Sequence, residues 1–173
     1  MRRNNTFPET LILLLIMMLI SFGVSCARRL PAPALVSLGD SVEAGGWRVT
    51  VQSFTALPGD PWRQPAMGNR FYAVELSVEN TSGEIRYVMP ERQMILQGPG
   101  GREFTLSESA GILSARQRQW LVVQGEVGAG QRLSGAASYE APAYCTACIF
   151  VFRAELSPFS EAVTFALGDP AEQ

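Results

Sequence analysis

The sequence predicts an all-β protein whose folded domain is an antiparallel β-sandwich. Residues 70–79 alternate between apolar and more polar side chains, which is the period of a strand with one buried face. About eight to ten short runs of this kind follow one another, with turn residues between them. No stretch has the pattern of a convincing long helix. This succession is typical of two packed antiparallel sheets.

The centre of the predicted fold is residues 70–89. In the strand 70–79, we expect Val74 and Leu76 to be buried and Glu75 and Ser77 to be exposed. Residues 80–83 then break the run with side chains that tolerate turn geometry, and residues 85–89 start back as a second strand. The pattern therefore predicts an antiparallel hairpin in a sheet that is buried on one side.

Two further strands are expected before this centre. Residues 42–44 and 47–54 form them, with a tight hairpin turn at Gly45 and Gly46. Phe54 falls out of phase with the apolar residues earlier in its strand. This shift predicts a β-bulge or a twist near the end of the strand.

Residues 57–68 form a long loop without periodicity, and loops of this length are often functional. Trp62 is its one large apolar side chain. One interpretation is a lid that folds back over the open end of the core. The other is an exposed anchor for a binding partner.

The second half of the chain continues the all-β pattern. Residues 107–119 are polar around two apolar residues, and they predict a loop or one to two helical turns. The expected strands are residues 93–97, 102–106, 120–123, 131–139, 148–152 and 162–167.

Composition limits the chemistry that the protein can perform. The 173 residues carry a formal net charge of -2, with no His, and all 14 basic residues are Arg. The commonest general base, the commonest metal-ligand nitrogen and the Schiff-base amine are therefore absent. We expect no catalytic activity and no cofactor. A basic face of the kind that binds nucleic acid is not expected either.

The N-terminus has the pattern of an export signal. Residues 1–25 combine a positive start with an apolar block that is short for a membrane span. Small residues precede Cys26, as in the lipobox of bacterial lipoproteins, which predicts that Cys26 carries a lipid and anchors the protein to the cell membrane. Cleavage after Ala27, which would give a secreted protein, and an uncleaved N-terminal anchor are the alternatives. All three place the domain outside the cytoplasm.

The rest of the chain divides into three segments. Residues 26–37 contain closely spaced prolines and predict a short, extended tether. Residues 38–168 form the β-sandwich, and residues 169–173 form a polar tail.

Cys145 and Cys148 form the only motif that could carry chemistry. A redox pair needs a helix N-terminus to lower the thiol pKa, but this pair runs directly into a strand. A zinc site needs about four ligands, which two Cys without His do not supply. Outside the cytoplasm we expect a structural disulfide, formed across a turn at residues 144–147.

Several short motifs in a fixed order carry a resemblance to a known family. They lie at residues 38–42, 47–51, 72–82, 100–104, 130–135 and 165–168. Their order resembles a family of bacterial extracytoplasmic domains of unknown function, similar to small secreted antigens. The resemblance implies an immunoglobulin-like fold, an extracytoplasmic location, often as a lipoprotein, and no catalytic residues. The loop around Trp62 and the cysteine pair depart from the family's pattern.

These observations favour a membrane-tethered binding module that acts without catalysis on an unknown envelope or surface protein. Trp62 is its candidate contact with that partner. One alternative is a thiol-disulfide active surface protein that uses Cys145 and Cys148. Another is a carrier with a small-ligand pocket between the two sheets.

Overall fold

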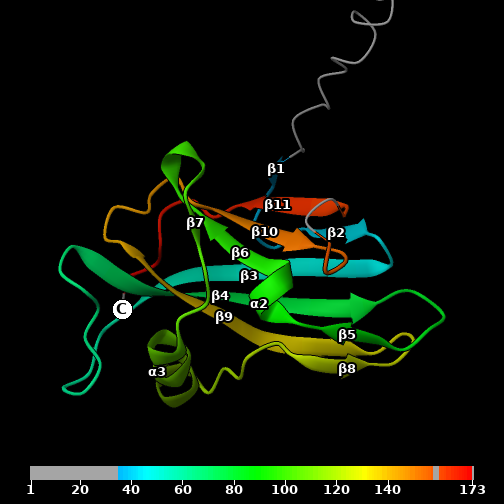
Figure 1. Cartoon of the computed structure of the whole chain (residues 1–173), viewed down its shortest axis with the longest axis horizontal. Helices are drawn as coiled ribbons and strands as arrows, with labels where there is room; N and C mark the ends of the chain where they lie inside the picture. The colour runs from blue at the N-terminus through cyan, green and yellow to red at the C-terminus, as the bar shows by residue number, and fades with distance from the viewer. Residues whose placement is uncertain (1–34, 158–159, 173) are drawn as a thin grey trace, which may run out of the picture. The chain divides into compact units, whose positions relative to one another are not determined.

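The computed structural model describes residues 35–157 and 160–172, and within these ranges a pair of sheets packs face to face (Figure 1). One sheet has five strands in the order β1-β11-β10-β6-β7, and the other has four in the order β2-β3-β4-β9. The predicted all-β sandwich is confirmed. The strands of the five-stranded sheet, in the order of the sheet, are β1 Leu35–Val36, β11 Ala162–Ala166, β10 Ile149–Arg153, β6 Met94–Gln97 and β7 Glu103–Phe104. Those of the four-stranded sheet are β2 Ser41–Ala44, β3 Trp47–Leu57, β4 Asn69–Asn80 and β9 Arg132–Pro142.

The sheets take in residues on both sides of the expected range 38–168. β1 pairs in parallel with β11, with Val36 opposite Phe165. Near the other end of the chain, the Ala171 N–H donates to the Phe54 carbonyl at 3.0 Å, so the polar tail lies along β3. The predicted export signal and Cys26 lie outside the described residues.

The interior between the sheets is apolar, and the bulge in β3 is confirmed. Val51 pairs with Leu76 and Ser53 with Glu75, so Gln52 is the extra residue. The bulge returns Phe54 to the inward-facing row. The large side chains that fill this core include Trp47, Tyr72, Leu76, Met94, Leu96, Tyr139, Phe150, Phe152 and Phe165.

The predicted hairpin between residues 70–79 and 85–89 is wrong. β4 lies between β3 and β9, and both of its edges are used. β4 ends at Asn80. The Asn80 side-chain amide donates to the Glu84 carbonyl at 2.6 Å and to the Val127 carbonyl at 2.9 Å, which directs the following residues away from β4 and toward residues 125–127. β5 (Arg86–Val88) therefore pairs with β8 (Gly125–Val127) in a separate two-stranded sheet.

The segment 107–124 also differs from the prediction. α3 (Glu108–Arg118) has about three turns rather than one or two, because Ser107 caps its start and Gln119 ends it in the left-handed conformation. Residues 120–123 do not form the predicted strand, and a single bridge joins Val122 to Ala136. The other helices are the single turn α2 (Pro90–Gln93) and the 3₁₀ turn η1 (Pro99–Gly101). None of the helices in the described ranges is long and apolar enough to cross a membrane.

β4 is buried on both faces over much of its length, with Glu75 and Glu79 partly exposed, whereas the sequence predicts one wet face. Val74 and Leu76 face the core, as predicted, and α3 covers the outer face at Phe71 and Ala73. The expectation that Ser77 is exposed is wrong. Only 4 % of Ser77 is accessible, because Gln52, the bulged residue, lies over it and donates to its hydroxyl at 3.2 Å.

One backbone carbonyl joins the two layers at the end of the sandwich that carries the Gly45–Gly46 turn. The Ala154 carbonyl, just after β10, accepts from Trp47 Nε1 at 2.9 Å and from Arg86 at 3.2 Å. The Arg86 guanidinium also lies over the Trp47 ring, 4.6 Å from its centroid. The turn itself has positive φ at both glycines, as a two-residue hairpin requires.

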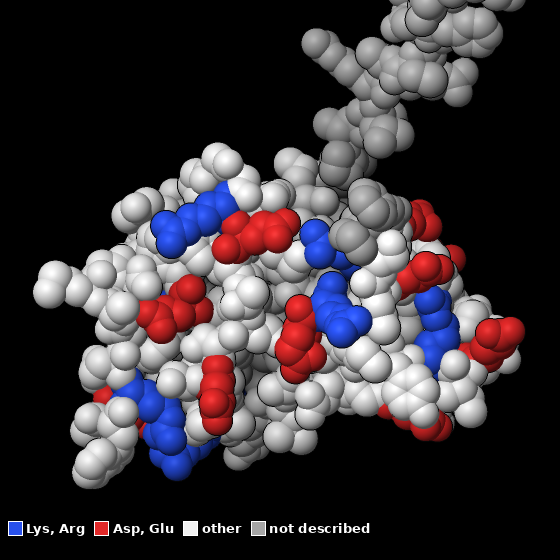
Figure 2. Space-filling view, viewed as in Figure 1, with Lys and Arg blue, Asp and Glu red and all other residues white. Residues whose placement is uncertain are grey.

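Charged residues are mixed by sign on the face that Figure 2 shows, and no broad field of one sign covers it. Across the four-stranded sheet, each strand contributes one residue to a row of ion pairs: Glu43, Arg48, Glu79 and Arg132. The hydrogen bond from Arg132 and the charge of Arg48 lower the pKa of the Glu79 carboxyl below its usual value. The row fixes the register of these strands on their solvent side.

A matched pair of tyrosines gives a stability prediction. Tyr72 and Tyr139 face each other on β4 and β9, but Tyr72 donates to the Pro142 carbonyl at 2.9 Å, whereas the fully buried Tyr139 hydroxyl has no partner among the described residues. Tyr139→Phe should therefore stabilise the domain by about 1 kcal/mol, and Tyr72→Phe should destabilise it by a similar amount. Urea unfolding of both variants measures this. Equal losses would show that Tyr139 is satisfied by a buried water.

Candidate functional site

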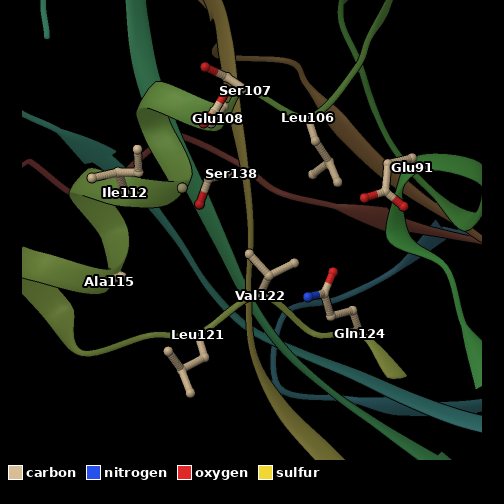
Figure 3. Close-up of a pocket in the computed structure, with 11 residues that line it drawn as sticks. Glu91, Leu106, Ser107, Glu108, Ile112, Ala115, Leu121, Val122, Gln124 and Ser138 are labelled. Carbon is tan, nitrogen blue, oxygen red and sulfur yellow. The ribbon is translucent and has the colours of Figure 1, made fainter. Parts of the chain in front are cut away.

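A groove opens at the β9 edge of the four-stranded sheet, between α3 and the segment 121–124 (Figure 3). Its volume is about 480 Å³, within the range of small-molecule and peptide side-chain sites. Apolar side chains dominate its walls. These are Leu106, Ile112, Ala115, Leu121 and Val122, and the polar residues around them are Glu91, Ser107, Glu108, Gln124 and Ser138.

α3 forms the first wall of the groove. The Ser107 hydroxyl accepts from the Ala110 N–H at 3.3 Å and caps the helix. Ala110 and Leu113 point down onto β4 and β9 and are buried there. Because a helix turns about 100° per residue, Ile112 and Ala115 then face sideways, into the groove.

The segment 121–124 forms the second wall, and it sits unusually close to β9. The Ala136 N–H donates to the Leu121 carbonyl at 2.9 Å. Gly135 makes this approach possible, since a Cβ at that position would collide with the Leu121 carbonyl oxygen. The Leu121 side chain is consequently held outward, 72 % accessible, at the rim of the groove.

The floor of the groove is the outer edge of β9, around Ser138. Figure 3 shows Ser138 between Ile112 of α3 on one side and Leu106 and Val122 on the other. The Ser138 carbonyl accepts from the Ser107 N–H at 2.9 Å. The chain thus covers the β9 edge at two points, residues 106–107 and 121–122, and the groove is the gap between them.

The groove has few polar side chains. The charged residues of its lining are Glu91, from α2, and Glu108, from the first turn of α3. Its two hydroxyl groups belong to Ser107, which caps α3, and to Ser138. In residues 35–157 and 160–172, no three His, Cys, Asp or Glu side chains gather in a way that could hold a metal ion.

Trp62 is not a lid. Its side chain is 86 % accessible, so the interpretation in which it covers the core is wrong. Asp60 holds the loop in shape by accepting from the backbone N–H groups of Trp62 at 2.8 Å and Arg63 at 2.6 Å. Burial raises the pKa of the Asp60 carboxyl, but these two hydrogen bonds and the Arg63 guanidinium outweigh it, and the net pKa lies below the usual value. Trp62 is therefore presented outward on an ordered turn.

Cys145 and Cys148 form a disulfide across the predicted turn, with their Cα atoms 5.3 Å apart. The two residues are only 2 % and 1 % accessible and belong to the core between the sheets. A small hollow of about 190 Å³ lies beside them, next to Phe104 and Tyr144. The disulfide thus links two residues of the short loop between β9 and β10.

The structure does not bring the sequence-predicted site residues together in the groove. Neither Trp62 nor the cysteine pair lines it, and Cys26 is not described. The groove residues were missed by sequence reasoning, because they come from four separate segments. One signal was available: Leu121 and Val122 are adjacent apolar residues, which a half-buried strand does not have.

The amino-acid sequence matches a known protein family over most of its length. Residues 36–161 match DUF4352, a domain of unknown function. No curated protein matches the chain.

Solved bacterial structures share the fold at low sequence identity. The yjhA protein of Bacillus subtilis is 13 % identical, with a TM-score of 0.57 over 77 % of this chain and 99 % of that one. The secreted protein MPT63 of Mycobacterium tuberculosis is 14 % identical, with a TM-score of 0.53 over 79 % of this chain and 98 % of that one.

A third similar structure is the B. subtilis protein ycdA, which carries a provisional description as a lipoprotein. It is 12 % identical, with a TM-score of 0.54 over 74 % of this chain and 38 % of ycdA. The chain therefore spans about two fifths of that protein's length.

Alanine substitutions at two glycines of the groove should change the stability of the domain in opposite directions. Gly135→Ala forces its methyl group into the Leu121 carbonyl and should destabilise the domain by about 1–3 kcal/mol. Gly111, within α3, faces open space, so Gly111→Ala should stabilise the domain by about 0.5–1 kcal/mol. Denaturant unfolding measures both. A neutral Gly135→Ala variant would show that the second wall moves freely away from β9.

The disulfide should behave as a structural link rather than a reagent. The exported protein should show no free thiol when denatured without reductant. Its double Cys145→Ser, Cys148→Ser variant should fold and lose about 2 kcal/mol, because the closed loop is short. Rapid alkylation of the reduced native protein at neutral pH, or reduction of a test disulfide by it, would contradict this.

Proposed function

We propose that this chain, which belongs to the DUF4352 family of domains of unknown function, is a non-catalytic binding module tethered outside the cytoplasm. In this proposal, a lipid on Cys26 anchors the protein to the cell membrane. The β-sandwich carries the groove between α3 and residues 121–124, which binds a segment of another envelope or surface protein.

The groove is the observation that carries the proposal. Soluble domains seldom leave a recess lined by several aliphatic side chains open to water, unless something binds there. Leu121 and Val122 are both exposed at its rim. The bond from Ala136 to Leu121 holds them in that position.

The tether is supported by the sequence and by the descriptions of two proteins of similar fold. The chain has a signal-like N-terminus that ends at Cys26. Among the proteins of similar fold, one is secreted and one has a provisional lipoprotein description. An extracytoplasmic location suits a disulfide between Cys145 and Cys148 as well.

The alternatives receive less support from the geometry. Thiol chemistry requires an accessible sulfur, whereas both cysteines are buried. A carrier of the kind considered from the sequence requires a pocket between the sheets, and the hollow beside the cysteines, at about 190 Å³, is much smaller than the groove. Trp62 remains a candidate for a second contact with the partner, because it is exposed on an ordered loop.

Photo-cross-linking in the native envelope tests the proposal. A benzoylphenylalanine in place of Leu121 should capture a defined protein, whereas the same residue in place of Leu156, which is exposed outside the groove, should not. Ala115→Trp fills the groove and should abolish the cross-link. Arg116→Trp adds the same side chain to the exposed face of α3 and should leave it unchanged.

The lipid anchor is tested separately. Cys26→Ser should release the protein from the membrane fraction or leave it unprocessed, and intact-mass analysis of the native protein should show the lipid. Capture from Leu121 that persists in the Ala115→Trp variant would contradict the groove as the binding site. A mature N-terminus at Arg28 without lipid would contradict the anchor.

A further inference from the structure

The outer edge of β9 holds a backbone donor that has no partner among the described residues. In an antiparallel ladder, the N–H and C=O of one residue point to the same side. The Ser138 carbonyl accepts from Ser107 on the outer edge, so the Ser138 N–H points to that edge too. No acceptor among the described residues bonds to it. Ser138 is 4 % accessible, and a buried N–H without a partner is costly.

The charge of the groove is the second observation. Glu91 and Glu108 are exposed at its margin, on different elements, and neither makes an ion pair among the described residues. The lining contains no Arg to offset them. A ligand with a positive charge beside its apolar part would be attracted to this site, and one with a negative charge would be repelled.

We propose that the groove binds an extended peptide segment in which an apolar residue is flanked by Arg or Lys. This inference rests on the proposed binding function and names its ligand. A peptide carbonyl accepts from the Ser138 N–H, and an aliphatic side chain fills the space between Ile112 and Val122. The flanking cations approach Glu91 and Glu108. A peptide supplies all three features along one chain, next to an edge strand that is open over a short length.

Fluorescence anisotropy with defined peptides tests this assignment. The full exported protein, in a non-ionic detergent, is titrated into a labelled heptapeptide of alternating leucine and arginine, and into analogues with glutamine or glutamate in place of arginine. The arginine peptide should bind about fivefold more tightly than the glutamine peptide at low salt, and the difference should shrink as salt rises. The glutamate peptide should bind most weakly.

Matched variants assign the effect to the groove. Glu91→Gln with Glu108→Gln should remove the preference for arginine while leaving the glutamine peptide bound. Glu84→Gln with Glu155→Gln makes the same change in net charge outside the groove, so the preference should persist. Octylguanidine has the cation and the apolar chain but no carbonyl, and it should compete poorly with the peptide.

Each failure has a separate meaning. Equal binding of the three peptides, or an unchanged preference in the Glu91→Gln, Glu108→Gln variant, would overturn the inference that the ligand carries positive charges that approach Glu91 and Glu108. Effective competition by octylguanidine, or no peptide binding at all, would overturn the assignment of a peptide. Only peptide binding that survives Ala115→Trp would count against the groove itself and thus against the proposed function.

Discussion

The burial of β4 on both faces is the constraint on which the rest of the structure depends. Its inward side chains pack in the core between the sheets, and Phe71 and Ala73 on the other face need a second cover. α3 supplies that cover. A helix laid across a sheet leaves recesses where its side curves away from the strands, and here β9 and residues 121–124 bound such a recess. The groove is thus a by-product of the way in which the sheet is covered.

The two walls of the groove are held by different means. α3 is held by packing, because Ala110 and Leu113 are buried against the sheet. The segment 121–124 has little buried surface beyond Val123, and it is held by a backbone bond to Ala136 and by the absence of a side chain at Gly135. The first wall is therefore rigid, while the second depends on a few contacts. A ligand that packs against both would reinforce the weaker one.

The sequence predicted the phase of the strands better than their pairing. The period of two in residues 70–79 and the bulge before Phe54 are local properties, and both are visible in the order of side chains. Strand pairing depends on the direction that the chain takes after each turn. Asn80 looks like a turn residue in the sequence, but its amide bonds to Val127, which lies 47 residues further along. No local pattern contains that information.

The sequence does not predict the full length of α3 or the position of the groove, and the reasons are related. The helix carries Gly111 in its middle and few apolar residues, so it lacks the stripe that identifies an amphipathic helix. Its helical state follows from a cap at Ser107 and from the sheet beneath it. The groove joins Glu91, Leu106, Val122 and Ser138, and only the folded sheet brings them together. The exposure of Trp62 depends in the same way on the hydrogen bonds to Asp60.

The short strand β1 has a mechanical consequence. A tether at the N-terminus would pull on Leu35 first, and β1 is held to β11 over only two residues. The next backbone bond to a neighbouring strand joins the Gly39 N–H to the Val51 carbonyl at 2.8 Å. Under tension, residues 35–38 would separate from the edge before the sandwich unfolds, releasing roughly 14 Å of chain at about 3.4 Å per residue. In the proposed arrangement, a pull between the membrane anchor and a partner in the groove would thus extend these residues first and leave the core folded.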